Sequence, residues 1–211
     1  MKKRVLSFVF SILFIQAFTY AQTDEYAEDF NSNTNNQWFT GKSGTKEASI
    51  KGGTYYLDNF DTSSTNHYLR QFKIDPHENY TIEAKFRQTS GSEEYGFGIL
   101  YGFDDWDNYI RIYVSKDYYK VLNKRKGKSD KVVDWKKEEG GKIKGINEWN
   151  TLKLEKTVSG VKIYINNNLL NTISPSKMLY IGDYFGFFVP SKTKVEVDYV
   201  KVKRVKRKMT Y

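Results

Sequence analysis

The chain has 211 residues, 17% of them aromatic, no cysteine and a formal net charge of +9. The lack of cysteine excludes disulfide bonds and lipid attachment at a processed N-terminal cysteine. Six basic residues lie in the last eleven positions: Lys201, Lys203, Arg204, Lys206, Arg207 and Lys208. The excess charge is therefore local, which argues against a nucleic-acid-binding face spread over the fold. This basic end is either a solvated strand edge and tail or a contact for acidic glycan or lipopolysaccharide.

Residues 1–21 predict a secretory signal. Lys2, Lys3 and Arg4 precede a mostly apolar stretch over 5–18, and Thr19 and Ala21 form a small-residue cleavage site. The stretch is shorter than the ~20 residues a membrane span needs. We expect an exported protein without a membrane span, in the periplasm, at the cell surface or outside the cell. The remaining 190 residues carry a net charge of +6 and suit one domain, 22–205, followed by a basic tail, 206–211.

From about residue 46 onward the chain alternates apolar and polar residues, which predicts strands with one buried face. The clearest case is "YTIEAKFRQ", where Tyr80, Ile82, Ala84 and Phe86 face one way. Segment 31–45 is rich in Asn, Ser, Thr and Gly and predicts a loop that Trp38 anchors in the core. Strands are expected over about 46–50, 54–58, 67–74, 80–88, 95–103, 108–114, 118–125, 131–135, 150–158, 160–167, 169–174, 184–190 and 194–205.

About a dozen strands with turn signals every eight to twelve residues predict an all-β antiparallel sandwich. Glycine and asparagine turns at Gly52-Gly53 and over 166–168 fit tight hairpins. In the last segment the alternation changes phase at Tyr199-Val200, which predicts a bulge or a strand buried on both faces.

Several segments in this order resemble the concanavalin A-like jelly-roll domains of bacterial exported proteins, especially the laminin-G-like and keto-disaccharide-hydrolase-like kinds. They include the "EDF" start, "YTIEAKFRQ", the Gly-rich strand leading into Asp and Asn, and "YFGFFVPSKTKVEVDYVKV". The most specific part is Trp149 to Leu154 followed by a "V-x-I-Y-I-N" strand. The resemblance covers nearly all of 24–205 and implies a jelly-roll sandwich. Such sandwiches host lectins, adhesins, glycosidases and inert modules, so the resemblance leaves the activity open.

An acidic corner separates two of the expected strands. Asp104, Asp105, Asp107 and Asn108 surround Trp106 within five residues. Asp and Asn are common in such corners because their side chains bond nearby backbone N–H groups. The same oxygens suit calcium, although the spacing lacks the order of an EF-hand loop. The corner is thus either a plain hairpin turn or a calcium site, the one cofactor the sequence suggests.

A catalytic pair of carboxylates is not apparent. Glucanases and laminarinases of the jelly-roll kind carry Glu-x-Asp-x-x-Glu along one strand, but here Glu196 and Asp198 are followed by Lys201 in the third position. The sequence has two histidines, His67 and His77, no cysteine and no G-x-S-x-G motif, so it indicates neither a nucleophile-base-acid set nor a zinc site, and we expect both histidines at the surface or rim. The resemblance to hydrolases keeps an enzyme possible through strand carboxylates such as Glu83 or Glu94.

A stripe of Tyr109, Arg111 and Tyr113 would face outward if Ile110, Ile112 and Val114 face the core. Aromatic rings stack on the C–H faces of sugars and a guanidinium bonds their hydroxyls, so the stripe predicts a glycan platform. Trp106 would lie at its rim, with Tyr118, Tyr119 or Trp135 nearby. Cross-strand packing is the alternative explanation. The sequence favours a carbohydrate-binding module without catalysis; a glycoside hydrolase and a structural or adhesion module that binds protein are the alternatives.

Overall fold

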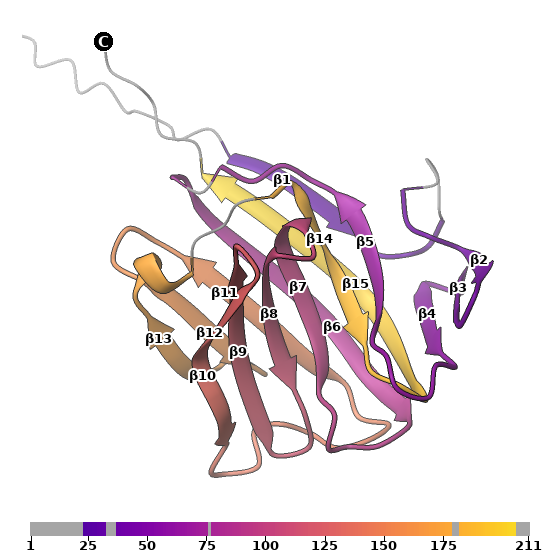
Figure 1. Ribbon diagram of the computed structural model, residues 1–211. Helices are drawn as coiled ribbons and strands as arrows, with labels where there is room; N and C mark the ends of the chain where they lie inside the picture. The colour runs from indigo at the N-terminus through magenta and orange to yellow at the C-terminus, as the bar shows by residue number, and fades with distance from the viewer. Residues whose placement is uncertain (1–22, 33–36, 76, 179–181, 206–211) are drawn as a thin grey trace, which may run out of the picture.

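The computed structural model describes residues 23–32, 37–75, 77–178 and 182–205. The expected signal, 1–21, and the tail, 206–211, lie outside the described residues. The described chain forms fifteen strands and a single 3-10 turn, η1 (Pro175–Lys177), and the strands make two antiparallel sheets packed face to face (Figure 1). The predicted all-β sandwich is therefore confirmed.

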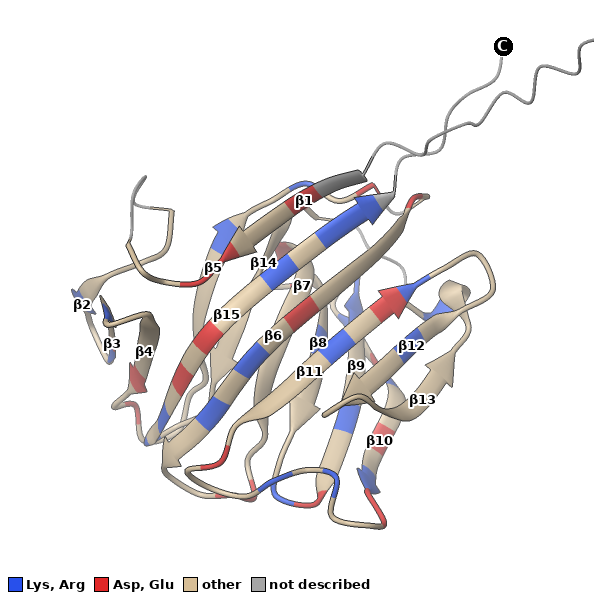
Figure 2. Ribbon diagram, turned by 180° about the vertical axis from the view of Figure 1, so that it is seen from behind, with Lys and Arg blue, Asp and Glu red and all other residues tan. Residues whose placement is uncertain are grey.

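The larger sheet has nine strands and is seen from behind in Figure 2. Its central pair is β6 (Asn79–Ser90) and the long last strand β15 (Thr193–Val205). The neighbour order is β13 (Asn168–Ile173), β12 (Val161–Ile165), β11 (Asn150–Lys156), β6, β15, β4 (Thr54–Asn59), β3 (Lys46–Lys51) and β2 (Gly41–Ser43), with β1 (Thr23–Glu28) paired to the later half of β15. Charged residues recur along the outer face of this sheet (Figure 2).

The smaller sheet has six strands and lies in front in Figure 1. Its order is β10 (Lys128–Lys137), β9 (Tyr118–Arg125), β8 (Asn108–Val114), β7 (Phe97–Asp105), β14 (Tyr184–Val189) and β5 (Asn66–Gln71). β8 and β9 bury alternate residues against the larger sheet, as Ile110, Ile112 and Val114 on β8 illustrate, whereas β7 and β14 are buried over consecutive residues and β10 has no buried residue. The other face of the smaller sheet is left without a covering layer.

Aromatic residues from both sheets fill the core around Trp38, which is 2% exposed. Its ring stacks on Phe187, meets Phe30 edge-on, and its Nε1 donates a hydrogen bond to Tyr26 Oη at 3.1 Å. The predicted anchoring of the 31–45 segment by Trp38 is confirmed. Burying a tryptophan removes a large apolar area from water and holds this segment against the sandwich.

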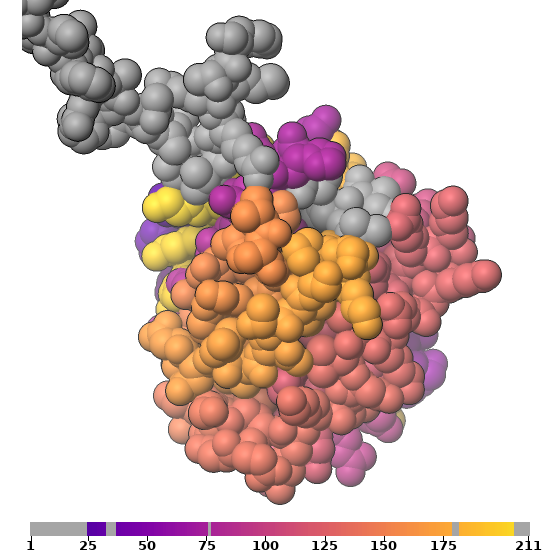
Figure 3. Space-filling view, turned by 90° about the vertical axis from the view of Figure 1, so that its left-hand side faces the viewer, coloured from indigo at the N-terminus to yellow at the C-terminus, as the bar shows by residue number. Residues whose placement is uncertain are grey.

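One side of the sandwich is closed by polar contacts between the two sheets. In the side view the orange segment that carries β13 and η1 lies against the strands of the smaller sheet (Figure 3). Tyr119 Oη donates to the Leu170 carbonyl at 3.1 Å, and Asn123 Nδ2 donates to the Lys177 carbonyl at 2.9 Å. Tyr119 is 2% exposed, so it belongs to the core and not to the glycan platform near which the sequence placed it.

The sequence did not predict two of the strands, β1 and β2. β2 is three residues long and exposed throughout, so it has no buried alternation to detect. β1 pairs with the half of β15 that follows the bulge. That bulge is the one predicted from the phase change: the register shifts between Val197 and Tyr199, and Val200 and Val202 are buried after it.

Candidate functional site

The stripe predicted on β8 faces away from the core, on the uncovered face of the smaller sheet. Tyr109, Arg111 and Tyr113 are half-buried and alternate with the core residues of the strand. The Arg111 guanidinium lies 4.7 Å from the centre of the Tyr109 ring and 5.3 Å from that of Phe188 on β14. Arg111 Nη1 donates to Tyr113 Oη at 3.2 Å. The stripe is thus a continuous aromatic strip with a cation at its centre.

His67 on β5 is the second partner of Arg111, with 2.5 Å between Arg111 Nη2 and His67 Nε2. The Trp106 ring packs against the imidazole at 4.7 Å and against Phe103 at 4.8 Å, and 54% of Trp106 stays exposed. Burial, then the charges of Arg111 and Lys46, lower the pKa of His67 to about 3. The imidazole is therefore neutral and its Nε2 accepts a hydrogen bond from Arg111.

The sequence predicts His67 at the surface or rim, and the structure places it on the outer face of the smaller sheet, half-buried and not at the rim. His77 is exposed, as expected. The imidazole is covered by Trp106 and Arg111, and both residues are distant from position 67 in the sequence.

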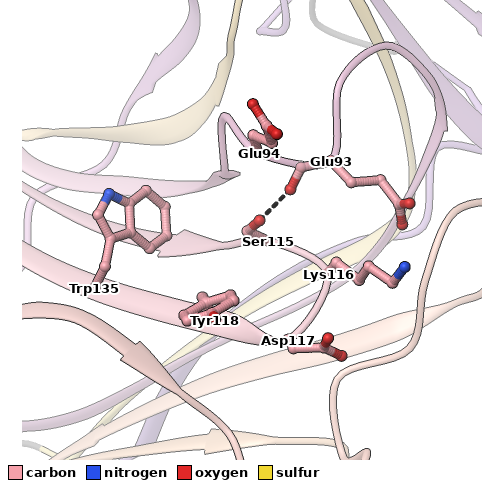
Figure 4. A pocket seen from close by; sticks show the side chains of 7 residues that line it. All are labelled: Glu93, Glu94, Ser115, Lys116, Asp117, Tyr118 and Trp135. Carbon is pink, nitrogen blue, oxygen red and sulfur yellow. Dashed lines mark hydrogen bonds between the residues drawn. The ribbon is translucent and has the colours of Figure 1, made fainter.

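Two pockets open at the end of this face where β8 finishes. The first encloses about 350 Å³ and is lined by Thr62, Ser63, Thr65, Glu94, Tyr95, Gly96, Tyr113, Trp135, Pro190 and Ser191. The second encloses about 320 Å³ and is lined by Glu93, Glu94, Ser115, Lys116, Asp117, Tyr118 and Trp135 (Figure 4). Trp135 and Glu94 line both pockets, so the two adjoin. Each is large enough for about one or two sugar rings and joins aromatic surface to hydroxyl and carboxylate groups.

Trp135 on β10 continues the aromatic strip from the stripe into the pockets. Its ring lies 5.7 Å from that of Tyr113, which in turn lies 4.6 Å from Phe188. Lys120 Nζ lies 5.6 Å from the centre of the Tyr113 ring and 5.5 Å from that of Trp135. In Figure 4 the Trp135 ring stands at one end of the second pocket, with Lys116 and Asp117 at the other.

A buried asparagine fixes the loop that supplies the hydroxyl groups of the first pocket. Asn59, 1% exposed, donates from Nδ2 to the Ser64 carbonyl at 2.8 Å and to the Val189 carbonyl at 2.9 Å. Its Oδ1 accepts from the Asp61 amide at 2.9 Å and from Asn66 Nδ2 at 2.6 Å. All four hydrogen-bonding positions of this amide are used, which ties the loop over 60–66 to β14.

A buried glutamine and a serine hold the loop on the other side of both pockets. Gln88 Nε2 donates to the carbonyls of Ser90 and Ser92 at 3.2 and 3.1 Å. Ser115 Oγ donates to the Glu93 carbonyl, the bond drawn in Figure 4. The Glu93 carboxylate accepts from the Ile146 amide at 3.2 Å. The pocket walls are therefore preorganised, which lowers the entropic cost of binding a ligand.

Asn150 organises the long connection from β10 to β11 behind the second pocket. It is 2% exposed; its Oδ1 accepts from the Lys144 amide and from Asn166 Nδ2, and its Nδ2 donates to the Lys144 carbonyl, each at 2.9 Å. Asn166 Nδ2 also donates to the Lys142 carbonyl at 2.7 Å. The segment Trp149 to Leu154, the most specific part of the resemblance, thus stabilises the fold through the buried side-chain amide of Asn150.

The acidic corner is the turn between β7 and β8. Asp105 Oδ1 accepts from the Asp107 amide at 2.8 Å and from Asn108 Nδ2 at 2.9 Å, while Asp107 pairs with Lys124 at 3.3 Å. Asp104 is exposed. In the part of the chain that the structure describes, no three His, Cys, Asp or Glu side chains cluster as a metal site would require. Calcium at this corner stays a prediction that a melting experiment tests.

The carboxylates of the last strand lie on the opposite side of the molecule, on the outer face of the larger sheet. Glu196 pairs with Arg87 at 2.7 Å and Asp198 with Lys85 at 2.7 Å. Glu83 accepts a hydrogen bond from Tyr199 Oη at 2.9 Å. These groups support the pairing of β15 with β6 and are remote from both pockets, because their side chains face away from the smaller sheet.

No protein-family model matches the sequence, and no curated protein matches it. Solved structures do. The carbohydrate binding module CBM66 from Bacillus subtilis is 18% identical with a TM-score of 0.54, over 77% of this chain and 94% of that one. The catalytic domain of an endo-1,3-beta-glucanase (laminarinase) from Thermotoga petrophila RKU-1 is 11% identical with a TM-score of 0.59, over 89% of this chain and 100% of that one.

The chain has the concanavalin A-like jelly-roll fold. A xylan beta-1,4-xylosidase from Bacillus halodurans C-125 carries the same fold in part of its length: it is 14% identical with a TM-score of 0.61, and this jelly roll aligns with 38% of it. At these identities the likeness concerns the fold alone. Within the described residues of the jelly roll, no helix is long and apolar enough to cross a membrane.

Sequence reasoning found one half of this site and missed the other. Tyr109, Arg111 and Tyr113 share a face, and Trp106 reaches that face through His67. Apart from Tyr113 and Trp135, the residues around the first pocket come from three connections, at 62–65, 94–96 and 190–191. No local motif marks them. Only the antiparallel order of β4, β5, β6, β7, β14 and β15 places these connections at one end of the jelly roll.

Proposed function

We propose that the protein is an exported carbohydrate-binding module that holds glycan on the outer face of its smaller sheet and does not cleave it. The observation that carries the proposal is the continuous strip of Tyr109, Arg111, Tyr113 and Trp135 that leads into two adjoining pockets. Sugar rings stack on such aromatic surface, and the threonine, serine and glutamate groups of the pocket walls match their hydroxyls.

Solved structures of similar fold support carbohydrate binding as a kind of function for this chain. They include a carbohydrate binding module and a carbohydrate recognition domain, that of Emp46p, which is 15% identical with a TM-score of 0.54. The fixed loops around the pockets add physical support, because a rigid rim loses little entropy when it meets a ligand. Export to the periplasm, the cell surface or the medium would bring the face to glycans outside the cytoplasm.

A glycan array with the purified protein tests the proposal, with and without EDTA. We expect binding to a restricted set of glycans, weakened by Tyr113→Ala. Tyr164→Ala is the matched control, because Tyr164 is a half-buried tyrosine with a stacked lysine on the larger sheet. Binding that is absent from the whole array, or equal in both variants, would refute the proposal and favour a module that binds protein.

Glycoside cleavage is the second candidate, and the acidic lining of the pockets favours it. Glu94 lines both pockets, and Glu93 and Asp117 line the second. Cleavage needs two carboxylates on either side of one sugar linkage. Release of reducing ends from an array ligand, abolished by Glu94→Gln or Asp117→Asn, would establish the enzyme in place of the binding module.

A further inference from the structure

The ion pairing of cations differs between the two sheets, and this difference bears on the kind of glycan the face would hold. Arg111 and Lys120 form no ion pair with any residue in the described ranges, whereas Lys85, Arg87 and Lys194 on the larger sheet all do. Of the outward cations on β8 and β9, Lys124 pairs with the carboxylate of Asp107 at 3.3 Å. Lys120 acts on a carboxylate only without direct pairing: after the hydrogen bond from Lys131, its charge helps to lower the pKa of Asp134.

Arg111 is the least compensated of these groups. Its protein partners on the face are the Tyr113 hydroxyl and the neutral imidazole of His67. Its Nε is buried and has no hydrogen-bond partner in the described structure. A guanidinium has five N–H donors, so the two bonds leave donor capacity on the Nη groups. A half-buried cation without a counter-charge is costly unless a ligand supplies one.

The positions of these cations follow the aromatic strip. Lys120 lies opposite Tyr113 in the pairing of β8 with β9, and Lys124 lies opposite Tyr109. Each ammonium group sits near the ring of its cross-strand neighbour, at 5.6 and 5.7 Å. A sugar stacked on either tyrosine would therefore have a cation at its edge.

We propose that the glycan held on this face is acidic and that Arg111, helped by Lys120, binds the carboxylate of a uronic acid. The inference rests on the proposed function and names the substrate class of the same face. A carboxylate fits the planar fork of a guanidinium with two parallel hydrogen bonds.

Matched glycan pairs test the inference by isothermal titration. The probes are oligogalacturonate, oligomannuronate, hyaluronate and heparosan, each compared with its carboxyl-reduced, neutral form. The expected result is that at least one acidic form binds about tenfold or more tightly than its neutral partner, an effect of about 1.4 kcal/mol. Arg111→Gln and Lys120→Gln should each shrink this ratio, and Lys201→Gln, which removes one charge from the opposite sheet, should leave it unchanged.

The outcomes separate the inference from the function on which it rests. Equal binding of the acidic and neutral forms in every bound pair overturns the uronic acid assignment while glycan binding stands. A ratio that Lys201→Gln lowers as much as Lys120→Gln also overturns it, because the effect would then come from overall charge. Binding of no glycan at all overturns the proposed function itself. The comparison of acidic and neutral forms needs no variant, so it decides the matter even if Arg111→Gln does not fold.

Discussion

The half-buried imidazole of His67 should make the stability of the protein depend on pH, and His67→Gln should remove the part of that dependence that comes from this residue. Glutamine does not titrate, and its amide oxygen can still accept a hydrogen bond from Arg111. In the folded state the pKa of His67 is about 3, against an ordinary value of 6.5, because burial and two nearby cations disfavour the imidazolium ion. The unfolded chain therefore binds more protons than the folded chain between these two values.

The free energy of unfolding must fall as the pH falls through this window, since protons favour the state that binds them. Between pH 7.5 and pH 5, protonation of an unfolded histidine of ordinary pKa stabilises the unfolded state by about 2 kcal/mol, while the folded imidazole stays neutral. Wild type should therefore lose about 2 kcal/mol more than His67→Gln over this interval, or roughly 4 to 8 °C in melting temperature.

Urea unfolding at pH 7.5 and pH 5, followed by tryptophan fluorescence, measures this difference. His77→Gln is the matched control, because it makes the same substitution at an exposed histidine. Equal losses in wild type and His67→Gln would refute the reasoning, since His67 would then titrate alike in the folded and unfolded states.

Three further predictions concern the packing and the acidic corner. Asn150→Ala should lower the free energy of unfolding by about 2 to 4 kcal/mol in urea, because it removes three hydrogen bonds that the buried Asn150 side chain makes with Lys144 and Asn166, and a loss below 1 kcal/mol would contradict the role of the amide. Gly186→Ala should cost about 3 kcal/mol or more in the same assay, because a Cβ on this strand of the binding face would overlap the Tyr68 carbonyl; wild-type stability would show that the sheet can open there. Millimolar calcium should leave the calorimetric melting temperature unchanged, because Asp105 and Asp107 of the β7–β8 corner already bond within the protein, and a rise would show that the folded protein binds calcium.

Most of the fold could be predicted from the sequence because strand alternation is a local signal. "YTIEAKFRQ" buries Tyr80, Ile82, Ala84 and Phe86 and leaves the intervening residues partly exposed, as its pattern indicates. The bulge before Tyr199 could be predicted for the same reason, since a phase change is visible in one strand. β2 could not, because three exposed residues carry no period.

The candidate site could be predicted only where it lies on one strand. The outward stripe of β8 follows from alternation within seven residues. His67 is half-buried because it contacts Arg111 on β8 and Trp106 in the turn between β7 and β8. The alternation of residues within β5 cannot predict contacts with other strands. The sequence places Tyr119 near the outer face, but the structure places it in the core. Alternation on β9 shows that Tyr118 and Tyr119 face opposite ways, but it does not show which of the two faces inward.

The measurement that tests the central claim most directly compares two tryptophan variants with a glycan that the wild type binds. Trp135 lines both pockets on the smaller sheet, whereas Trp149 lies near Lys85 and Arg87 of the larger sheet. By isothermal titration, Trp135→Ala should weaken binding about tenfold or more, as the loss of an aromatic stacking partner implies, and Trp149→Ala should change it by less than about twofold. The opposite pattern, with binding lost in Trp149→Ala and kept in Trp135→Ala, would place the glycan on the other sheet and contradict the account.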